Sequence, residues 1–291
     1  MKASALYRDL REALTSAAGE GASYEAREIL SELLEKPFPM ILASYEELSA
    51  DVVSRAMDVA KRRACGEPLA YILGFAYFYG LRFSVSPACL IPQADTEIVT
   101  EKTVAHLKKR MRFADICTGS GCIALAALHE TEGTEAYAYD LSEGALAVAR
   151  ENAEALGLEG RFHAIHADVF AKDFLADAGL FDLIVSNPPY IPTSVIGTLE
   201  SDVQAEPHMA LDGGADGLDF YRRLLDVCPA HIRKGGVLLL EIGYDQRETL
   251  SALCEERGLA YEIFRDFGGN DRVCLVKILT ISFIYYIRRS L

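Results

Sequence analysis

The residues Asn187-Pro188-Pro189-Tyr190 directly follow FDLIVS, an apolar run that is typical of a buried strand. Each proline fixes its own φ angle and pushes the residue before it into an extended conformation, so the segment is rigid. The Asn187 side-chain oxygen and the Pro188 carbonyl can accept hydrogen bonds from the two N–H groups of a planar amide or aryl amine. Tyr190 offers a flat face to such a group. The pattern predicts chemistry on a delocalised nitrogen, with Asn187, Pro188 and Tyr190 as the catalytic residues.

A second group of residues lies in a loop between a predicted strand and a predicted helix. The loop consists of Cys117, Thr118, Gly119, Ser120 and Gly121. Its glycines let a ligand approach the backbone, and N–H groups at the start of the helix favour polar or anionic groups. Asp140 ends the next predicted strand, 21 residues after Gly119, and its carboxylate can accept hydrogen bonds from both hydroxyls of a ribose. Together the two features predict a nucleoside-binding site.

The residues of the same loop help to decide between two cofactors that contain a nucleoside. A dinucleotide such as NAD carries a pyrophosphate, which a full G-x-G-x-x-G loop binds. Here Cys117 and Cys122 stand where a pyrophosphate loop requires small residues. S-adenosylmethionine has no phosphate and needs less of that cradle, so we predict it as the cofactor. Asn187 and Pro188 would then orient the lone pair of the substrate nitrogen toward the sulfonium methyl group.

The elements that must position these residues alternate between strands and helices. Strands are predicted at 113–117, 135–140, 161–168, 181–187 and 235–243, and helices at 95–110, from Cys122, at 142–156, around Tyr221 and around Leu250. This alternation, with continuous apolar strands, indicates a parallel sheet covered on both faces. Two consecutive strands at 261–266 and 272–278 predict an antiparallel hairpin at the end of the sheet.

The first 75 residues show a helical pattern instead. Leu6, Leu10 and Leu14 recur at helical spacing, and Ser49 is placed to cap a helix that runs to about Ala64. The aromatic and β-branched segment at 69–92 then predicts a β-hairpin. We therefore expect a helical domain at 1–75, a hairpin linker at 76–94 and an α/β domain at 95–291.

Composition limits the function further. Of 291 residues, 51% are hydrophobic and 25% charged, which excludes disordered and collagen-like classes. The net charge of −14 disfavours non-specific binding to nucleic acid. The seven cysteines form no C-x-x-C pair, so we expect no metal site and predict buried, reduced thiols. The longest apolar stretch has about 13 residues where a membrane span needs about 20, and no secretory signal is recognisable, so a cytoplasmic location is expected.

The chain resembles the HemK/PrmC family, the peptide chain release factor glutamine methyltransferases. Besides NPPY and Asp140, the resemblance rests on the segments RRACGEPLAYILGFAYFYGLRFSV, LIPQADTE, DICTGSGCIALA, GGADGLDFYRRL, LLLEIGYDQ and DFGGNDRV. They occur in the expected order from about residue 25 to about residue 277. The resemblance implies a class I (Rossmann-like) methyltransferase sheet with a small N-terminal helical domain joined by a β-hairpin. It also implies S-adenosylmethionine as methyl donor and, as substrate, the glutamine of the Gly-Gly-Gln loop of release factors.

The resemblance also implies roles for individual residues. The methionine and adenosine parts of the cofactor would be lined by Cys117, Thr118, Gly119, Ser120 and Gly121. Asp140 would hold the ribose and Val169 would flank the adenine. Asn187 would touch cofactor and substrate, and the glutamine would be bound by Asn187, Pro188, Pro189 and Tyr190.

Three features depart from the family pattern. Gln93 and Ala94 follow Pro92 where the family usually has Arg-Pro, and Val169 occupies a position that is often aromatic. The tail from Leu279 to Leu291 extends beyond the usual end. Three further features receive structural interpretations. We expect His163 and His166 to be core or surface residues rather than ligands, and Lys61-Arg62-Arg63 to form a solvated helix face. Glu241, at a strand end near the active edge of the sheet, is expected to orient a loop or to assist the site rather than to act as a base.

Alternatives remain for the substrate and the partners. A ribosomal-protein glutamine methyltransferase shares the NPPY chemistry, and an adenine-N6 nucleic-acid methyltransferase also uses this motif, although the acidic charge argues against it. A catalytically silent cofactor-binding module is the alternative outside enzymes. The favoured interpretation has release factors as partners, docked by the helical domain. It includes no direct nucleic-acid partner, no membrane association and a monomeric chain.

Overall fold

The computed structural model describes residues 1–44 and 47–279 and shows an α/β protein with two compact units. The first unit comprises Met1–Phe75 together with Leu199–Ala205. The second comprises Ala76–Thr198 and the chain from Glu206 onward. Of the predicted tail, only Leu279 lies within the described residues.

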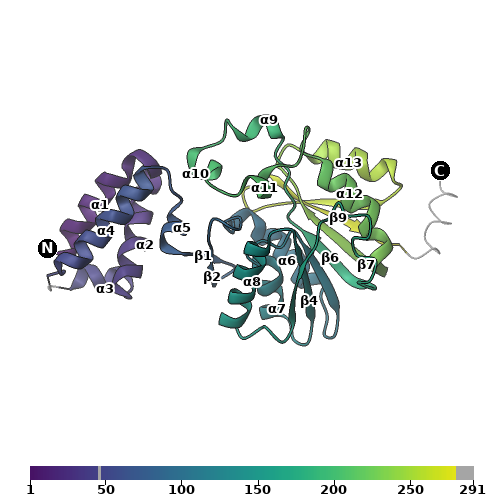
Figure 1. Cartoon of the computed structure of the whole chain (residues 1–291), viewed down its shortest axis with the longest axis horizontal. Coiled ribbons are helices and arrows are strands. Elements are labelled where there is room, and N and C mark those ends of the chain that lie inside the picture. Colours follow the sequence, from purple (N-terminus) through teal and green to yellow (C-terminus); the bar gives the residue numbers. More distant parts are fainter. Residues whose placement is uncertain (45–46, 280–291) are drawn as a thin grey trace. The chain divides into compact units, whose positions relative to one another are not determined.

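The first unit is helical, as the leucine spacing predicted. Its helices are α1 (Ala3–Ala18), η1 (Gly19–Gly21), α2 (Ala22–Leu34), α3 (Phe38–Ala43), α4 (Ala50–Ala64), α5 (Leu69–Leu73) and the short α10 (Ser201–Gln204) (Figure 1). Leu6, Leu10 and Leu14 are fully buried between α1 and its neighbours. The Ser49 side chain accepts a hydrogen bond from the backbone N–H of Val52 and so caps α4, which confirms the predicted start of this helix.

Arg63 was wrongly predicted to lie on a solvated basic face. Lys61 and Arg62 are exposed as expected, but only 6% of Arg63 is exposed. Its guanidinium lies 3.1 Å from the Glu25 carboxylate on α2 and 3.3 Å from that of Asp202 on α10. The residue falls on the buried stripe of α4, where a charge is tolerated only because these two carboxylates compensate it. The pair with Asp202 ties the 199–205 segment to the helical unit.

We expect Arg63→Ala to lower the free energy of unfolding by about 3 kcal/mol, because it leaves two partly buried carboxylates without a counter-ion. Arg62→Ala is the matched control, since Arg62 pairs with Glu67 at the surface and its loss should cost less than about 1 kcal/mol. Urea unfolding of both variants measures the difference. Equal losses in the two variants would show that the buried ion pairs of Arg63 stabilise the fold no more than the surface pair of Arg62.

The predicted hairpin exists but is shorter than the segment that suggested it. Its strands are β1 (Phe75–Phe78) and β2 (Leu81–Ser84), and residues 69–73 form helix α5 instead. Helix α5 begins after Pro68, and Gly74 ends it in the left-handed conformation. Phe78 and Phe83 are fully buried in the core of the second unit, so the hairpin is part of that core rather than a free linker.

The second unit is built on a seven-stranded sheet with the order β5-β4-β3-β6-β7-β9-β8. The strands are β3 (Arg112–Ile116), β4 (Glu135–Asp140), β5 (Phe162–His166), β6 (Phe181–Ser186), β7 (Ile232–Glu241), β8 (Ala260–Arg265) and β9 (Asp271–Lys277). The first five in this order pair in parallel. Strand β9 is antiparallel to both β7 and β8. The predicted parallel sheet and its terminal antiparallel hairpin are confirmed.

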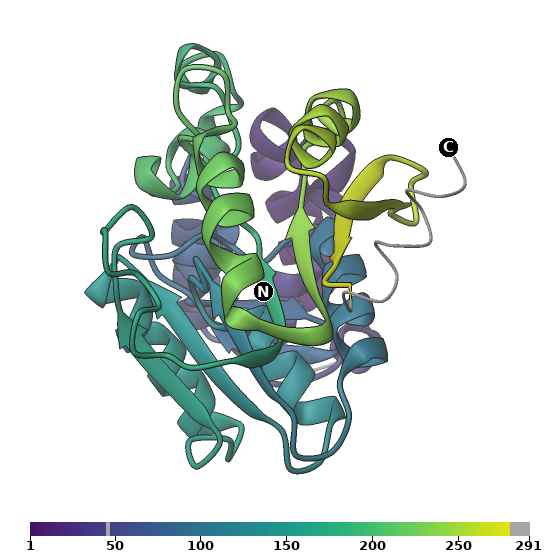
Figure 2. The same ribbon diagram turned by 90° about the vertical axis from the view of Figure 1, so that its right-hand side faces the viewer.

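Helices cover both faces of this sheet (Figure 2). One face packs on α6 (Glu97–His106), α7 (Cys122–Glu130) and α8 (Glu143–Ala155), and the other on α12 (Asp219–Val227) and α13 (Arg247–Glu256). Strand β6 contributes Leu183 and Val185 to the first core and Ile184 to the second, as side chains of a strand alternate. The helix predicted at 95–110 is shorter, because a 3₁₀ turn, η2 (Ala94–Thr96), precedes it and it ends at His106.

The remaining elements are short. They are α9 (Thr193–Ile196), α11 (His208–Leu211) and η3 (Cys228–His231). Within residues 1–44 and 47–279, no helix has the length and apolar character needed to cross a bilayer. All seven cysteines are free, and most are buried as predicted, but Cys65 at the end of α4 is exposed.

Candidate active site

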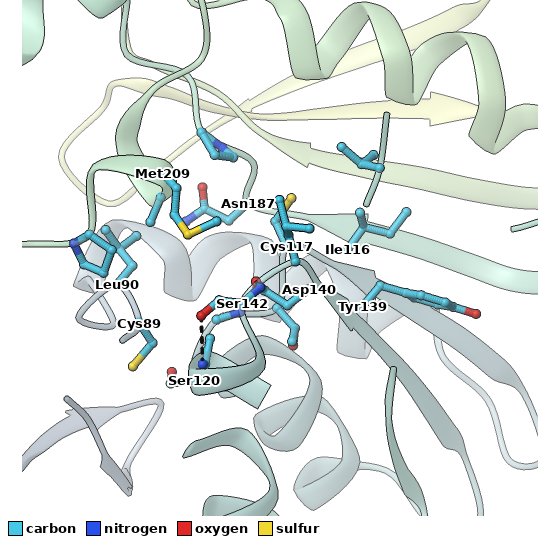
Figure 3. Close-up of a pocket in the computed structure, with 18 of the residues that line it drawn as sticks. Cys89, Leu90, Ile116, Cys117, Ser120, Tyr139, Asp140, Ser142, Asn187 and Met209 are labelled. Carbon is cyan, nitrogen blue, oxygen red and sulfur yellow. Dashed lines mark hydrogen bonds between the residues drawn. The ribbon is translucent and has the colours of Figure 1, made fainter. Parts of the chain in front are cut away.

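A pocket of about 460 Å³ lies where the carboxyl ends of β3, β4, β5 and β6 meet (Figure 3). Parallel strands bring their following loops to one edge, so residues far apart in the sequence share this site. Of the residues predicted from the sequence, the pocket is lined by Cys117, Thr118, Gly119, Ser120, Asp140, Val169, Asn187 and Pro189. Gly121, Pro188 and Tyr190 lie outside its lining.

The loop after β3 is held in an unusual backbone conformation. Cys117 has a φ of 60°, in the left-handed region that residues with a side chain rarely adopt. A Cβ atom on Gly119 would meet nothing within 4 Å, so the backbone is open at this point. A Cβ on Gly121 would lie 3.1 Å from the Leu125 side chain and 3.2 Å from that of Ala149. Gly119 can therefore face a ligand, whereas Gly121 lets α7 and α8 pack together.

Thr118 ties the loop to the strand beneath it. Its hydroxyl donates to the Asp115 carboxylate over 2.7 Å, and its backbone N–H donates to the Tyr139 carbonyl. Asp115 is completely buried, and burial raises the pKa of its carboxyl to about 7. These contacts fix the start of the loop from inside the sheet.

The Asp140 carboxylate links two loops of the pocket. One of its oxygens accepts from the Gly119 N–H and the other from the Ser142 N–H, each over 2.8 Å. Burial raises the pKa of Asp140, while these hydrogen bonds act in the opposite direction. The sequence predicted a ribose acceptor here. The structure adds that the same carboxylate shapes the glycine loop before any ligand arrives.

The wall beside Val169 contains aromatic residues that the sequence analysis missed. Val169 is buried in the pocket lining, and its carbonyl accepts from the Arg223 guanidinium over 2.8 Å. The next residue, Phe170, packs edge-on against Phe220, with 4.9 Å between the ring centroids, and both line the pocket. The departure at Val169 is therefore accompanied by an aromatic pair nearby. Phe170 could have been found from the sequence because it directly follows Val169, whereas nothing in the sequence pointed to Phe220.

The Asn187 amide is fixed by a contact behind the pocket. Its Nδ2 donates to the hydroxyl of Thr96 over 3.3 Å. Thr96 belongs to η2 and is buried, although it also reaches the pocket lining. Because Nδ2 is used in this way, the side-chain oxygen of Asn187 is left for a partner in the pocket.

The backbone that follows is held by a buried glutamine. The Gln246 Nε2 donates to the Tyr190 carbonyl over 3.0 Å and to the Gly217 carbonyl over 3.3 Å. Its Oε1 accepts from the Gly243 N–H over 2.9 Å and, over 3.2 Å, from the Tyr221 hydroxyl, which shares its single proton with the Glu241 carbonyl at 2.9 Å. With four hydrogen bonds the amide has one orientation, so the loop after β6 has one position.

Two glycines let a neighbouring segment pack directly on this loop. A Cβ on Gly213 would lie 2.7 Å from the Tyr190 Cα, and one on Gly217 would lie 2.3 Å from the Tyr190 carbonyl oxygen. Gly217 also has a φ of 73°. Residues 213–217 therefore need glycine at both positions because two backbones meet there.

Charged residues gather behind the loop. Arg272 on β9 lies 2.9 Å from the Asp95 carboxylate and 3.3 Å from that of Asp266. Burial raises the pKa of the Tyr190 phenol well above its usual value, so this group is neutral. Glu241, at the end of β7, is 2% exposed and does not line the pocket.

Other pocket residues were not predicted as site residues. Leu90 and Gln93, before η2, belong to the LIPQADTE segment that the sequence analysis singled out, whereas no pattern in the sequence pointed to His208 and Met209 on α11. His163 and His166, on β5, are substantially exposed and lie outside the pocket lining. In the described part of the chain, no group of three or more His, Cys, Asp or Glu side chains could hold a metal ion.

Comparison with known proteins matches this geometry to a family. Residues 5–74 match the PrmC N-terminal domain, and residues 93–199 match the methyltransferase small domain. The release factor glutamine methyltransferase of Moorella thermoacetica is 44% identical over 245 residues, which cover 81% of this chain and 84% of the relative. The chain belongs to the release factor glutamine methyltransferase family. The family member of Caulobacter vibrioides is 41% identical, over 79% of this chain and 80% of its own.

A solved structure agrees in fold. The methyltransferase from Pyrococcus furiosus aligns with a TM-score of 0.50 and 19% identity, covering 70% of this chain and 91% of that one. Membership of the release factor glutamine methyltransferase family makes the chain a methyltransferase whose methyl donor is S-adenosylmethionine. The pocket fits this cofactor, since it offers a carboxylate at Asp140, an open backbone at Gly119 and aromatic rings at Phe170 and Phe220.

For this release factor glutamine methyltransferase family member, we expect Gly217→Ala to lower kcat about 100-fold, because the new methyl group would push the Tyr190 carbonyl and displace the loop that carries Asn187. Gly235→Ala is the matched control. Gly235 also has a positive φ, 83°, but a Cβ there meets nothing within 4 Å. Methyl transfer by both variants, with cofactor binding as a check of folding, measures the effect. Similar activities in the two variants would contradict the steric argument.

Proposed function

We propose that this enzyme transfers the methyl group of S-adenosylmethionine to the side-chain amide nitrogen of the glutamine in the Gly-Gly-Gln loop of peptide chain release factors. The substrate is supported by the names of the relatives, which are release factor glutamine methyltransferases. The structural observation that carries the proposal is the fixed amide of Asn187 in the pocket wall. It suits a substrate with a planar NH₂ group.

The residues act mainly by orientation. An amide nitrogen is a poor nucleophile because its lone pair is delocalised. The Asn187 Oδ1 and the Pro188 carbonyl accept its two N–H groups and hold the nitrogen plane, which turns the lone pair toward the cofactor side of the pocket. When bound, S-adenosylmethionine supplies the activated methyl group. The amide proton can leave after transfer, so no strong base is required.

Pro189 and Tyr190, the other residues of the motif, have different roles. Pro189 lines the pocket and offers an apolar surface to the glutamine side chain. Tyr190 lies outside the lining, and its carbonyl is held by Gln246. We assign substrate contact to Asn187 and Pro189, which line the pocket, and to the backbone carbonyl of Pro188 between them, although Pro188 is not itself part of the lining. Tyr190 holds the loop in place through its backbone carbonyl.

Transfer of labelled methyl to purified release factor tests the proposal. We expect label on wild-type release factor and none on a release factor whose loop glutamine is replaced. Asn187→Ala should lower kcat about 100- to 1000-fold, as loss of a preorganised hydrogen-bonding group does. Its affinity for the cofactor, measured by calorimetry, should change much less and shows that the variant is folded.

Other outcomes decide between the alternatives. Label on a ribosomal protein, with none on release factor, would support a ribosomal-protein glutamine methyltransferase instead. Label on nucleic acid would support an adenine-N6 methyltransferase, which also uses the NPPY chemistry. Cofactor binding without transfer to any of them would support a silent binding module.

The helical unit is proposed to dock the body of the release factor. A single glutamine loop buries too little surface for recognition of a whole protein, which needs about 800 Å² on each partner. The unit contains a groove of about 630 Å³ whose lining holds three acidic residues, Glu32, Glu35 and Asp58, one basic residue, Arg55, and several apolar ones. Such a groove suits a basic segment of a partner.

Charge reversal in the groove tests docking. Glu35→Lys with Asp58→Lys should raise the KM for release factor about tenfold and leave kcat and cofactor affinity unchanged, because like charges then meet. Glu12→Lys with Glu20→Lys is the matched control, since both residues are exposed and lie outside the groove. Equal changes in KM for the two pairs would refute docking in the groove. Deletion of 1–75 is a poorer test because it removes the partners of Asp202.

The proposal also includes the cellular location of the enzyme and its oligomeric state. Translation takes place in the cytoplasm, and a substrate that acts there supports a cytoplasmic location. The chain is proposed to work as a monomer and without contacting nucleic acid, which the net charge of −14 supports.

A further inference from the structure

Glu241 is a buried carboxyl group that the proposed reaction does not use directly. It ends β7, is 2% exposed and lies outside the pocket lining. Its Oε2 atom is buried without a hydrogen-bond partner among the described residues. A buried polar atom in this state costs free energy, so its retention calls for a functional reason.

The neighbours of Glu241 include the residue that orients the substrate. Ser186 on β6 pairs with Leu240 on β7 in parallel register, so Asn187 and Glu241 follow at the ends of adjacent strands. Thr96 and Asn187 are the polar side chains that favour the ionised form of the carboxyl group. Thr96 in turn accepts a hydrogen bond from the Asn187 Nδ2 over 3.3 Å. A hydroxyl has a single proton, and when it accepts from Asn187 this proton is free to be donated to Glu241.

The direction of these hydrogen bonds depends on the charge of Glu241. An ionised carboxylate can only accept, so it draws the Thr96 proton and the Asn187 N–H groups toward itself. The Asn187 oxygen is then turned away, toward the pocket. A protonated Glu241 can donate to Thr96 instead, and the Asn187 amide then loses the preference that keeps its oxygen toward the substrate.

Charged and titratable groups face Glu241 from several elements. Arg272 on β9 favours the ionised form and Asp95 in η2 opposes it, while Tyr190, Tyr221 and Cys122 complete the surroundings. Arg272 is itself paired with Asp95 and Asp266, which limits its effect. Burial is the largest influence and raises the pKa of Glu241 to about 7. The group therefore changes charge in the neutral range.

We propose that Glu241 is a positioning residue, which in its ionised form acts through Thr96 to hold the Asn187 amide with its oxygen toward the substrate nitrogen. The proposal rests on the proposed function of Asn187. It assigns to the end of β7 a role in the reaction although no atom of Glu241 touches the substrate.

Glu241→Gln tests the role of the charge. Glutamine keeps the shape but adds a donor, so kcat should fall roughly 10- to 100-fold while cofactor affinity stays unchanged. Wild-type kcat should fall as the pH drops through about 7, where Glu241 becomes protonated, and this acid limb should be absent in the variant. An unchanged kcat, or an acid limb that persists in Glu241→Gln, would overturn the proposal.

Thr96 provides a matched pair of variants. Thr96→Ser keeps the hydroxyl and should keep most of the activity, whereas Thr96→Val should lose about as much as Glu241→Gln. The double variant Glu241→Gln with Thr96→Val should be no worse than either alone, since both break one chain of contacts. Equal losses in Thr96→Ser and Thr96→Val would show that shape, and not the hydroxyl, matters.

A measurement independent of activity separates this proposal from the choice of substrate. Carbon NMR of the Glu241 carboxyl group gives its pKa directly. The pKa should rise in Thr96→Val, because the contact that favours the ionised form is lost, and should stay near the wild-type value in Thr96→Ser. An unchanged pKa in Thr96→Val would refute the contact. Failure of wild-type enzyme to label release factor would instead refute the proposed substrate.

Discussion

The hydrogen bond from Gln246 to the Tyr190 carbonyl is the contact on which the loop after β6 depends. An amide side chain has two donor and two acceptor positions, and here the protein supplies four partners to a largely buried Gln246. The side chain cannot rotate without breaking several of them at once. The loop is therefore rigid from both directions, because prolines fix its φ angles and Gln246 fixes its end. A reaction on a weak nucleophile requires such rigidity, since orientation supplies most of the catalysis.

The cofactor side of the pocket is organised by the same principle, with different groups. Asp140 accepts from two loops, and Asn152 on α8 donates to the carbonyls of Ser84 and Ser120 and accepts from the Ser84 N–H. The hairpin, the glycine loop and α8 are thus joined by one buried amide. A loop that is held by such bonds leaves less ordering for a ligand to impose. The strained φ of Cys117 is maintained by these surroundings.

The sequence was sufficient for features that depend on local pattern. Leu6, Leu10 and Leu14 predicted a buried helix face, and the strands that end at Asp140 and before Asn187 were predicted because continuous apolar runs mark a covered parallel sheet. It was insufficient where distant segments meet. Arg63 looked solvated because its partners are 38 and 139 residues away. Gln246 and Glu241 stood in recognisable motifs, but only the fold shows that both act behind the NPPY loop.

Side chains hold the turn that precedes α6. Ala94 begins η2, so this turn has no proline to fix its φ. The turn is held by side chains instead, because Asp95 pairs with Arg272 and Glu97 accepts from the Tyr79 N–H over 2.8 Å. These contacts set the position of Thr96, which lies between them in the sequence. The orientation of Asn187 therefore depends on an ion pair to β9 and on the hairpin, and neither β9 nor the hairpin lines the pocket.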